Sequence, residues 1–159
     1  MKPIIFLDID GVLNNRQYTM LKLSQGQPKG RMPFDPESLT VLKEILEETG
    51  AEVVLSSTWR YMGLEKVQNR LAEAGFDIVF KSETPFISKA PRGWEIREWL
   101  VKNIENGWDF KNYLIIDDDG DMMLGQADNF VNTNFDTGLR QEHKARCIEI
   151  LKRDTDDEI

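Results

Sequence analysis

The stretch IIFLDIDGVLNN, residues 4–15, places four apolar residues directly before Asp8, and Asp10 and Gly11 follow at once. A short apolar run of this kind favours a strand that is buried on both faces, as strands are in a parallel sheet. Two negative charges at the end of a buried strand need neutralising. The stretch therefore predicts a central strand with a charged site at its end.

Short apolar runs alternate with helical patterns along the rest of the chain. Further strands are predicted at EVVLSS, FDIVF, YLIID and NFVNT, which are residues 52–57, 76–80, 113–117 and 129–133. Helices are predicted at 36–49 between a cap at Asp35 and Gly50, at 64–75, around 96–100 and at 139–151, with an irregular segment before Pro36. This order predicts an α/β fold, a Rossmann-like three-layer sandwich with a mainly parallel central sheet.

Length, composition and charge set further limits. A chain of 159 residues suits one domain, and residues 154–159 are expected to form an acidic C-terminal tail. The sequence has no apolar run long enough for a membrane span or a secretory signal, and its single cysteine is Cys147, so we expect a cytoplasmic protein. The net charge of −8 argues against non-specific coating of nucleic acid.

Polar residues stand at the ends of three predicted strands. Asp8 ends the first strand, Ser56 and Ser57 end the second, and Asp117 and Asp118 end the YLII strand. The carboxyl ends of parallel strands share one edge of the sheet, so these side chains are expected to converge. Carboxylates so close together repel one another unless a cation neutralises them, and Mg²⁺ prefers such oxygen ligands. A magnesium site is therefore predicted.

The order of these motifs resembles a known superfamily. FLDIDGVLN, the serine after VVL, a basic residue before the next-but-one helix and IIDD resemble the four motifs of haloacid dehalogenase-like (HAD) phosphohydrolases. VVLSSTWR, TPF, RGWEI, LIIDDD and a closing GL are similar to the HAD domain of Swiss Army Knife RNA-repair proteins. The resemblance implies a magnesium-dependent phosphatase domain over residues 1–153. It points to phosphorylated nucleic-acid ends, 3′-phosphates above all, or to nucleotides as substrates.

The chemistry of such a reaction assigns different roles to the two aspartates of the opening motif. Asp8 is the expected nucleophile, which would form an aspartyl-phosphate. Asp10 can return to the site if Gly11 lets the chain turn, and would then act as general acid and base, with its backbone carbonyl on the metal. The expected metal ligands are Asp8, Asp10, Asp117 and Asp118, and Gly11 is expected beside the substrate.

Hydroxyl and cationic side chains are needed to hold the phosphoryl group. Ser56 is expected to donate its hydroxyl to a phosphoryl oxygen, and Ser57 and Thr58 are alternatives. Helix capping is the other interpretation of these residues, and it is preferred for Thr58. Arg60 either holds a substrate phosphate or forms a surface salt bridge. Arg92, directly before GWEI, is the preferred cation, with Lys89 and then Lys81 in reserve because the superfamily more often has lysine there.

Other conspicuous residues receive structural interpretations. Trp94, Trp99 and Trp108 are expected in the core or at its rim, whereas Trp59 could also line a base-binding surface. Asp119 and Asp121 are expected in solvent, and His143 is given no chemistry. A basic stretch is either a solvated loop or the lip of a substrate groove; it comprises Arg16, Lys22, Lys29 and Arg31.

Several alternatives to a nucleic-acid phosphatase stay open. A phosphatase of small phosphometabolites fits the same motifs. A phosphorylatable signalling module would have its acidic pair on the first strand, whereas here the pair comes late, and a silent binder of nucleic-acid ends would show no turnover. The segment before Pro36 has about twenty residues, too few for a separate cap domain, so an open site is expected.

Overall fold

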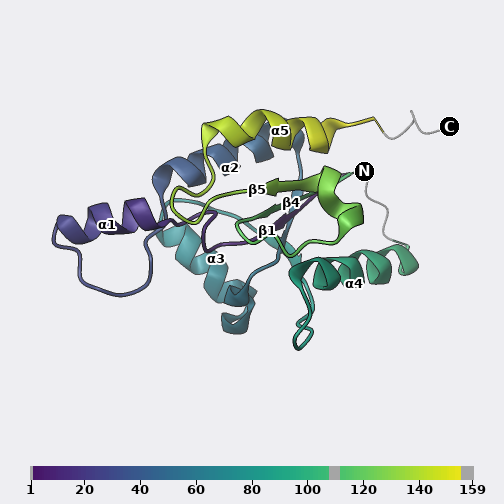
Figure 1. Ribbon diagram of the computed structural model, residues 1–159, viewed down its shortest axis with the longest axis horizontal. Helices are drawn as coiled ribbons and strands as arrows, with labels where there is room; N and C mark the ends of the chain where they lie inside the picture. Colours follow the sequence, from purple (N-terminus) through teal and green to yellow (C-terminus); the bar gives the residue numbers. More distant parts are fainter. Residues whose placement is uncertain (1, 108–111, 155–159) are drawn as a thin grey trace.

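The computed structural model describes residues 2–107 and 112–154. Within them, five parallel strands form one sheet in the order β3-β2-β1-β4-β5, as Figure 1 shows in part. The strands are β1 (Ile4–Leu7), β2 (Glu52–Leu55), β3 (Phe80–Glu83), β4 (Tyr113–Asp117) and β5 (Phe130–Asn132). The first strand of the chain is thus the middle strand of the sheet.

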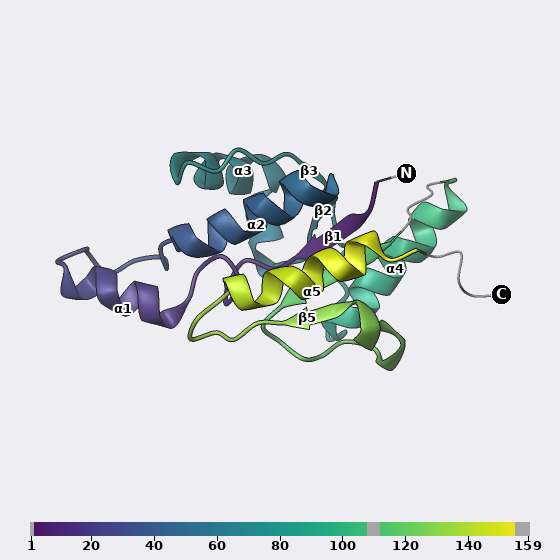
Figure 2. The same cartoon turned by 90° about the horizontal axis from the view of Figure 1, so that it is seen from above.

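Helices cover both faces of the sheet. They are α1 (Arg16–Ser24), α2 (Pro36–Thr49), α3 (Leu64–Glu73), α4 (Arg92–Glu105) and α5 (Gln141–Lys152), with short 3₁₀ helices η1 (Thr58–Met62) and η2 (Leu124–Asn129). Helices α2, α3 and α5 pack on one face and α4 on the other (Figures 1 and 2). The predicted three-layer α/β sandwich is confirmed, and the described residues contain no separate cap domain.

Three local predictions need correction. β3 begins at Phe80 rather than at residue 76, since Phe76 is already buried against the core and Val79 is 83% exposed. Leu139 precedes α5 instead of lying within it. The segment before Pro36 is not wholly irregular, because it contains α1.

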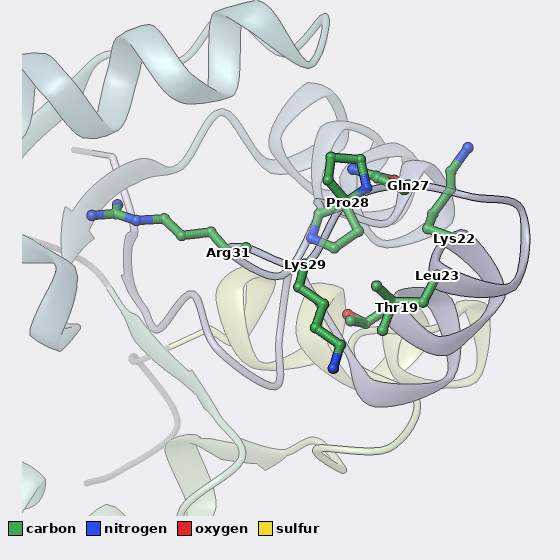
Figure 3. Close-up of a pocket in the computed structure, with 9 residues that line it drawn as sticks. Thr19, Lys22, Leu23, Gln27, Pro28, Lys29 and Arg31 are labelled. Carbon is green, nitrogen blue, oxygen red and sulfur yellow. The ribbon is translucent and has the colours of Figure 1, made fainter.

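Helix α1 forms an arm at one end of the molecule (Figures 1 and 2). Asn15 caps it by accepting a hydrogen bond from the Tyr18 N–H at 2.7 Å, yet no residue of α1 is buried. The helix therefore has no buried apolar stripe from which it could be predicted. The chain returns through residues 25–33, which with α1 enclose the pocket of Figure 3, and a bridge between Asn14 and Phe34 closes the arm at its base.

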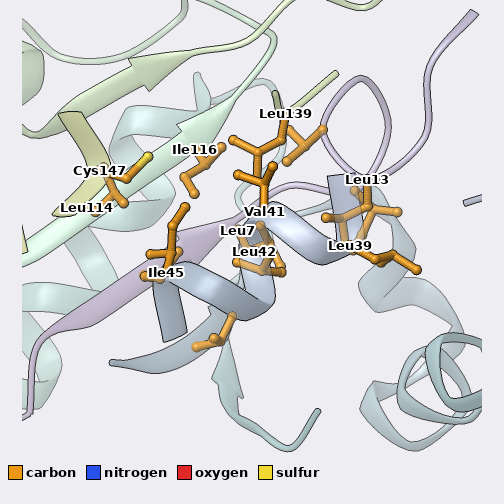
Figure 4. Close-up of a cluster of buried hydrophobic side chains, with 14 of the residues drawn as sticks. Leu7, Leu13, Leu39, Val41, Leu42, Ile45, Leu114, Ile116, Leu139 and Cys147 are labelled. Carbon is orange, nitrogen blue, oxygen red and sulfur yellow. The ribbon is translucent and has the colours of Figure 1, made fainter. Parts of the chain in front are cut away.

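The apolar core follows from alternation along the strands. Ile5 and Leu7 of β1 face the large cluster beneath α2, α3 and α5, whereas Ile4 and Phe6 face the smaller cluster beneath α4. Figure 4 shows part of the larger cluster, in which side chains of α2 meet those of the sheet and Cys147. Continuous apolar strands are needed because both faces are covered.

The strand order places the site. The chain moves from β1 to β2 and β3 on one side, then returns across β1 to β4 and β5 on the other side. The connections that follow the neighbouring parallel strands β1 and β4 therefore run to opposite sides of the sheet. This arrangement leaves a crevice at the carboxyl ends of the two strands. Asp8 follows β1 and Asp117 ends β4, so both lie at this crevice.

Some sequence predictions fall outside the described residues, namely those on Trp108 and on residues 155–159 of the tail. Of the predicted core tryptophans, Trp99 is buried edge-on against Phe6, whereas Trp94 is 51% exposed. No helix in residues 2–107 and 112–154 has the length and apolar character needed to cross a membrane.

A close backbone contact sets the position of α4. A Cβ atom at Gly93 would lie 2.6 Å from the backbone nitrogen of Met123 and 3.0 Å from Cα of Met122. Gln126 donates to the Gly93 carbonyl at 2.9 Å. The first turn of α4, which carries Arg92, therefore rests directly on the segment after β4.

We predict that Gly93→Ala lowers the free energy of unfolding by about 1–3 kcal/mol, because the methyl group meets the backbone of Met122 and Met123 as well as the Gln126 side chain. Gly125→Ala is the matched control, since nothing lies within 4 Å of its Cβ position, and its effect should stay within about 0.5 kcal/mol. Urea unfolding measures both. A neutral or stabilising Gly93→Ala would contradict this account of the α4 contact.

Candidate active site

Three carboxylates meet at the crevice between β1 and β4. One oxygen from each of Asp8, Asp117 and Asp118 lies within 4.8 Å of the other two. Asp8 is 6% exposed and Asp117 only 1%. The pairing of Leu7 with Ile116 in adjacent parallel strands brings the residues that follow them to the same edge. The structure thus brings together the three carboxylates expected as ligands, whereas Asp10 was expected to contribute its backbone carbonyl.

Burial makes these charges costly. It is the largest cause that raises the pKa of Asp8 to about 7, against the lowering effects of Arg92, the Ile9 N–H and the Ser57 hydroxyl. Burial and then the charge of Asp8 raise the pKa of Asp117 to about 9. The pKa of Asp118 is also raised, chiefly by burial. The three groups therefore favour either shared protons or a bound cation.

The residues present fit a hard divalent cation. Oδ2 of Asp117 is buried and, within the described residues, has no hydrogen-bond partner. Nε of Arg92 lies 3.6 Å from that oxygen, so it supplies charge without a hydrogen bond. A cluster of carboxylate oxygens with an unpartnered buried member suits Mg²⁺. Asp8, Asp117 and Asp118 would hold it.

Gly11 makes the turn that follows Asp8 possible. Its φ is +75°, and a Cβ atom there would collide with the Asp118 carboxylate. The Gly11 N–H donates to Oδ1 of Asn14 at 3.0 Å, and the Thr133 hydroxyl donates to the Gly11 carbonyl at 2.7 Å. Only glycine combines this conformation with so close an approach of the acid.

Asp10 is held apart from the three clustered carboxylates. Asn14 donates from Nδ2 to its Oδ1 at 2.8 Å, and the Trp59 indole N–H is 3.1 Å from both oxygens. Asp10 is half-buried and lines a pocket of about 590 Å³. Its side chain is thus fixed at the mouth of the site.

The serines that follow β2 differ in their partners. Ser56 is 2% exposed, and its Oγ has no hydrogen-bond partner among the described residues. The Ser56 N–H donates to the Leu7 carbonyl at 2.8 Å, which sets this residue beside Asp8. Ser57 is fully buried; its hydroxyl accepts from the Trp59 N–H and bonds to Asp8. Ser57 therefore orients the Asp8 carboxyl while it caps η1.

Arg60 forms a buried ion pair rather than a surface one. Its Nη2 donates to Oε1 of Glu95 at 2.8 Å, and its Nη1 donates to the Thr84 hydroxyl at 3.1 Å. Glu95 also accepts from the Ile87 N–H at 3.0 Å. This network joins η1 and α4 to the loop after β3. It leaves one buried Arg60 atom, Nε, without a partner in the described chain.

Among the candidate cations, the structure brings Arg92 to the carboxylates. Its side chain is 15% exposed, and Nη1 is buried without a hydrogen-bond partner in residues 2–107 and 112–154. Lys89 is exposed in the loop before α4, at a φ of +62°. Lys81 pairs with Glu52, the first residue of β2, and so lies toward the other end of the strands.

Further residues support the site although no motif or spacing in the sequence indicated this role. Asp121 accepts from the Arg92 N–H at 2.8 Å, so it caps α4 instead of being merely solvated. Asn14, Glu95 and Thr133 were not singled out by sequence reasoning. Asn14 follows Asp10 by four residues, and this spacing was its only available signal.

The cations of the α1 arm have different surroundings. Arg16 donates to Asp136 at 2.6 Å. Arg31 lies over the Trp59 ring, 5.5 Å from its centroid. The Trp59 ring also meets Phe34 at 5.5 Å, so the tryptophan is enclosed on more than one side. Trp59 thus serves as a partner of Asp10 rather than as an open stacking surface.

Comparison with known proteins identified one family. The family model described as the HAD domain in Swiss Army Knife RNA repair proteins matches residues 4–144, which include both aspartate motifs and all the site residues described above. A search of curated proteins gave no match.

We predict that without metal these carboxyls reduce stability as the pH rises. Unfolded aspartates titrate near pH 4, whereas in the fold the pKa of Asp8 is about 7 and that of Asp117 about 9. The folded chain therefore binds more protons over that range, so the stability contributed by these groups is complete below about pH 4 and lost by about pH 9. Mg²⁺ should raise the melting temperature more at pH 8 than at pH 5.

Thermal unfolding in chelator and in Mg²⁺ measures this effect. Asp117→Asn should flatten the pH dependence and the response to Mg²⁺, while Asp77→Asn, at an exposed position, should preserve both. An equal shift by Mg²⁺ at the two pH values would contradict the prediction.

Proposed function

The chain belongs to the family of HAD domains found in Swiss Army Knife RNA repair proteins, and from this we propose a magnesium-dependent phosphatase that forms an aspartyl-phosphate on Asp8. Family membership suggests phosphatase activity in its own right. The observation that supports the finer proposal is the convergence of Asp8 with the buried Asp117, the half-buried Asp118, the largely buried Arg92 side chain and the unpartnered hydroxyl of Ser56.

The first step is attack on phosphorus. When bound, Mg²⁺ offsets the negative charge of the carboxylates and of the phosphoryl group. An oxygen of Asp8 forms a bond to phosphorus while the bond to the leaving oxygen breaks. Ser56 Oγ and Arg92 Nη1 donate to phosphoryl oxygens, and both atoms are buried with their hydrogen-bonding capacity unused. Asp10 protonates the leaving oxygen.

The second step releases phosphate. Asp10, now ionised, takes a proton from a water molecule whose oxygen attacks the phosphorus of the aspartyl-phosphate. The bond from phosphorus to Asp8 breaks and inorganic phosphate leaves. The hydrogen bonds from Asn14 and Trp59 to the Asp10 carboxylate hold it in one orientation for both proton transfers.

We place phosphorylated nucleic-acid ends, in particular 3′-phosphates, first among the substrates. The family description names RNA repair proteins, and the pocket beside Asp10 is open to a large substrate. Nucleotides and small phosphometabolites fit the same chemistry, and a non-enzymatic binding module would hold phosphate without release. A panel of 3′- and 5′-phosphorylated RNA and DNA, nucleotides and sugar phosphates separates these functions. Far better hydrolysis of sugar phosphates than of any oligonucleotide end would rule out our choice.

We predict that Asp8→Asn abolishes turnover and covalent labelling, because an amide cannot form the acyl-phosphate. Asp10→Asn should instead slow both steps by about 100- to 10,000-fold with a poor leaving group. With a good leaving group, it should give a stoichiometric burst and accumulate label on residue 8. Mass spectrometry of the labelled peptide measures the intermediate. Label on Asp10 or Asp117 would overturn the assignment of Asp8 as nucleophile, and wild-type turnover by Asp8→Asn would favour direct attack by water.

We also predict that Trp59→Phe slows turnover about 10- to 100-fold, since it keeps an aromatic ring but removes the indole N–H that orients the Asp10 carboxyl. The loss should be larger for substrates with poor leaving groups, which depend on proton donation by Asp10. Trp94→Phe is the matched control, at an exposed position on α4. An equal loss for good and poor leaving groups would show that Trp59 acts through the fold and not through Asp10.

A further inference from the structure

Two pockets adjoin on the surface beside Asp10. The first, of about 590 Å³, is lined by Asp10, Tyr61 and Phe135 among others. The second, of about 260 Å³, lies between α1 and the loop that follows, with Lys22 and Lys29 in its lining. Gly30 and Arg31 line both. A ligand that leaves the active site past Asp10 can therefore continue into the pocket of the α1 arm.

This arm concentrates positive charge on an acidic protein. The chain has 28 acidic residues and a net charge of −8, yet residues 11–34 contain no aspartate or glutamate. Arg16 is neutralised by Asp136. In the part of the chain that the structure describes, Lys22, Lys29 and Arg31 form no ion pair with a carboxylate. Their charges are therefore available to an anionic ligand.

The three cationic side chains spread apart instead of converging. Figure 3 shows that Lys22, Lys29 and Arg31 extend from the pocket in different directions. Arg31 reaches across toward the Asp10 side, where its guanidinium bonds to Met62 and covers Trp59. A single phosphate requires donors that converge on one point, whereas spaced cations suit a chain of phosphates.

Exposed aromatic side chains line the same pocket as Asp10 and Arg31. Tyr61 is 71% exposed and Phe135 is 44% exposed, and both line the pocket that contains Asp10. Aromatic faces next to spaced cations form the usual surface for unpaired bases and their backbone. An acidic peptide would use the cations but has no need of the aromatic faces.

We infer that the two pockets form a track for a single-stranded oligonucleotide. A base near the phosphorylated end stacks on Tyr61 or Phe135, and phosphates further along the strand contact Arg31, Lys29 and Lys22. The placement of the terminal phosphate at Asp8 rests on the proposed function. The binding of the strand to the arm does not, because it depends only on the surface of the track.

Binding without turnover tests the track. The probe is a short 5′-fluorescein single-stranded oligonucleotide with a 3′-phosphate, titrated with the full chain carrying Asp8→Asn and measured by fluorescence anisotropy at several salt concentrations. Adding Lys22→Gln and Lys29→Gln should weaken binding about three- to tenfold at low salt. It should also reduce the slope of log affinity against log salt by about 0.7 for each cation removed.

Matched variants separate local from general effects. Lys43→Gln with Lys152→Gln removes the same charge from exposed positions on α2 and α5 outside both pockets, and should change affinity and slope less. Phe135→Ala should weaken binding about fivefold or more, whereas Trp94→Ala should not. Circular dichroism of each variant checks that it is folded. The slope of log affinity against log salt for the Asp8→Asn chain itself measures the contribution of cations without any further substitution.

Some outcomes overturn the inference. Equal weakening by the two double variants would mean that only net charge matters. Displacement of the oligonucleotide by polyglutamate of equal charge, as efficient as by unlabelled oligonucleotide, would show a general anion surface. Turnover of p-nitrophenyl phosphate by the wild-type chain with Mg²⁺ tests the proposed function separately. If the wild-type chain lacks this turnover but the variants show the predicted loss of binding, the inference of an oligonucleotide track is supported and the proposed phosphatase function is refuted.

Discussion

The site depends on carboxylates of like charge that lie next to each other at the carboxyl end of a buried apolar sheet. Because Leu7 pairs with Ile116 in register, Asp8 and Asp117 have to emerge side by side between the two helical layers. Carboxylates in such surroundings repel each other and lose their hydration, which raises their pKa values. The fold compensates only in part, through Arg92, Ser57 and backbone N–H groups. Because this compensation is incomplete, the crevice is suited to a bound cation.

The groups around the carboxylates are held by contacts distant in sequence. Trp59 reaches Asp10 from the segment after β2, and Arg60, the next residue, is anchored by Glu95 of α4. Asp121, after β4, caps the helix that carries Arg92. These three contacts each join segments that follow different strands of the sheet. Such cross-links limit rotation of the side chains, which lowers the cost of holding them in one reactive arrangement.

The sequence was sufficient for the sheet and for the carboxylate cluster, because both follow from local periodicity and from the common edge of parallel strands. It was insufficient where tertiary contacts decide the structure. Helix α1 buries none of its residues and so has no apolar stripe, and β3 is an edge strand whose polar residues hide its bounds. The bond from Trp59 to Asp10 spans 49 positions. Its donor lies in a short 3₁₀ helix whose direction no propensity specifies.

The uneven distribution of charge constrains how a polyanion can approach. With a net charge of −8, the protein as a whole repels nucleic acid. Screening confines each charge to roughly 10 Å at ordinary salt, so a local group of cations can still attract phosphates while the rest of the surface does not. The residues 11–34, which lack acids, leave and rejoin the fold beside Asp10. On our proposal, this local group of cations attracts a phosphorylated end to the side of the protein that carries Asp10.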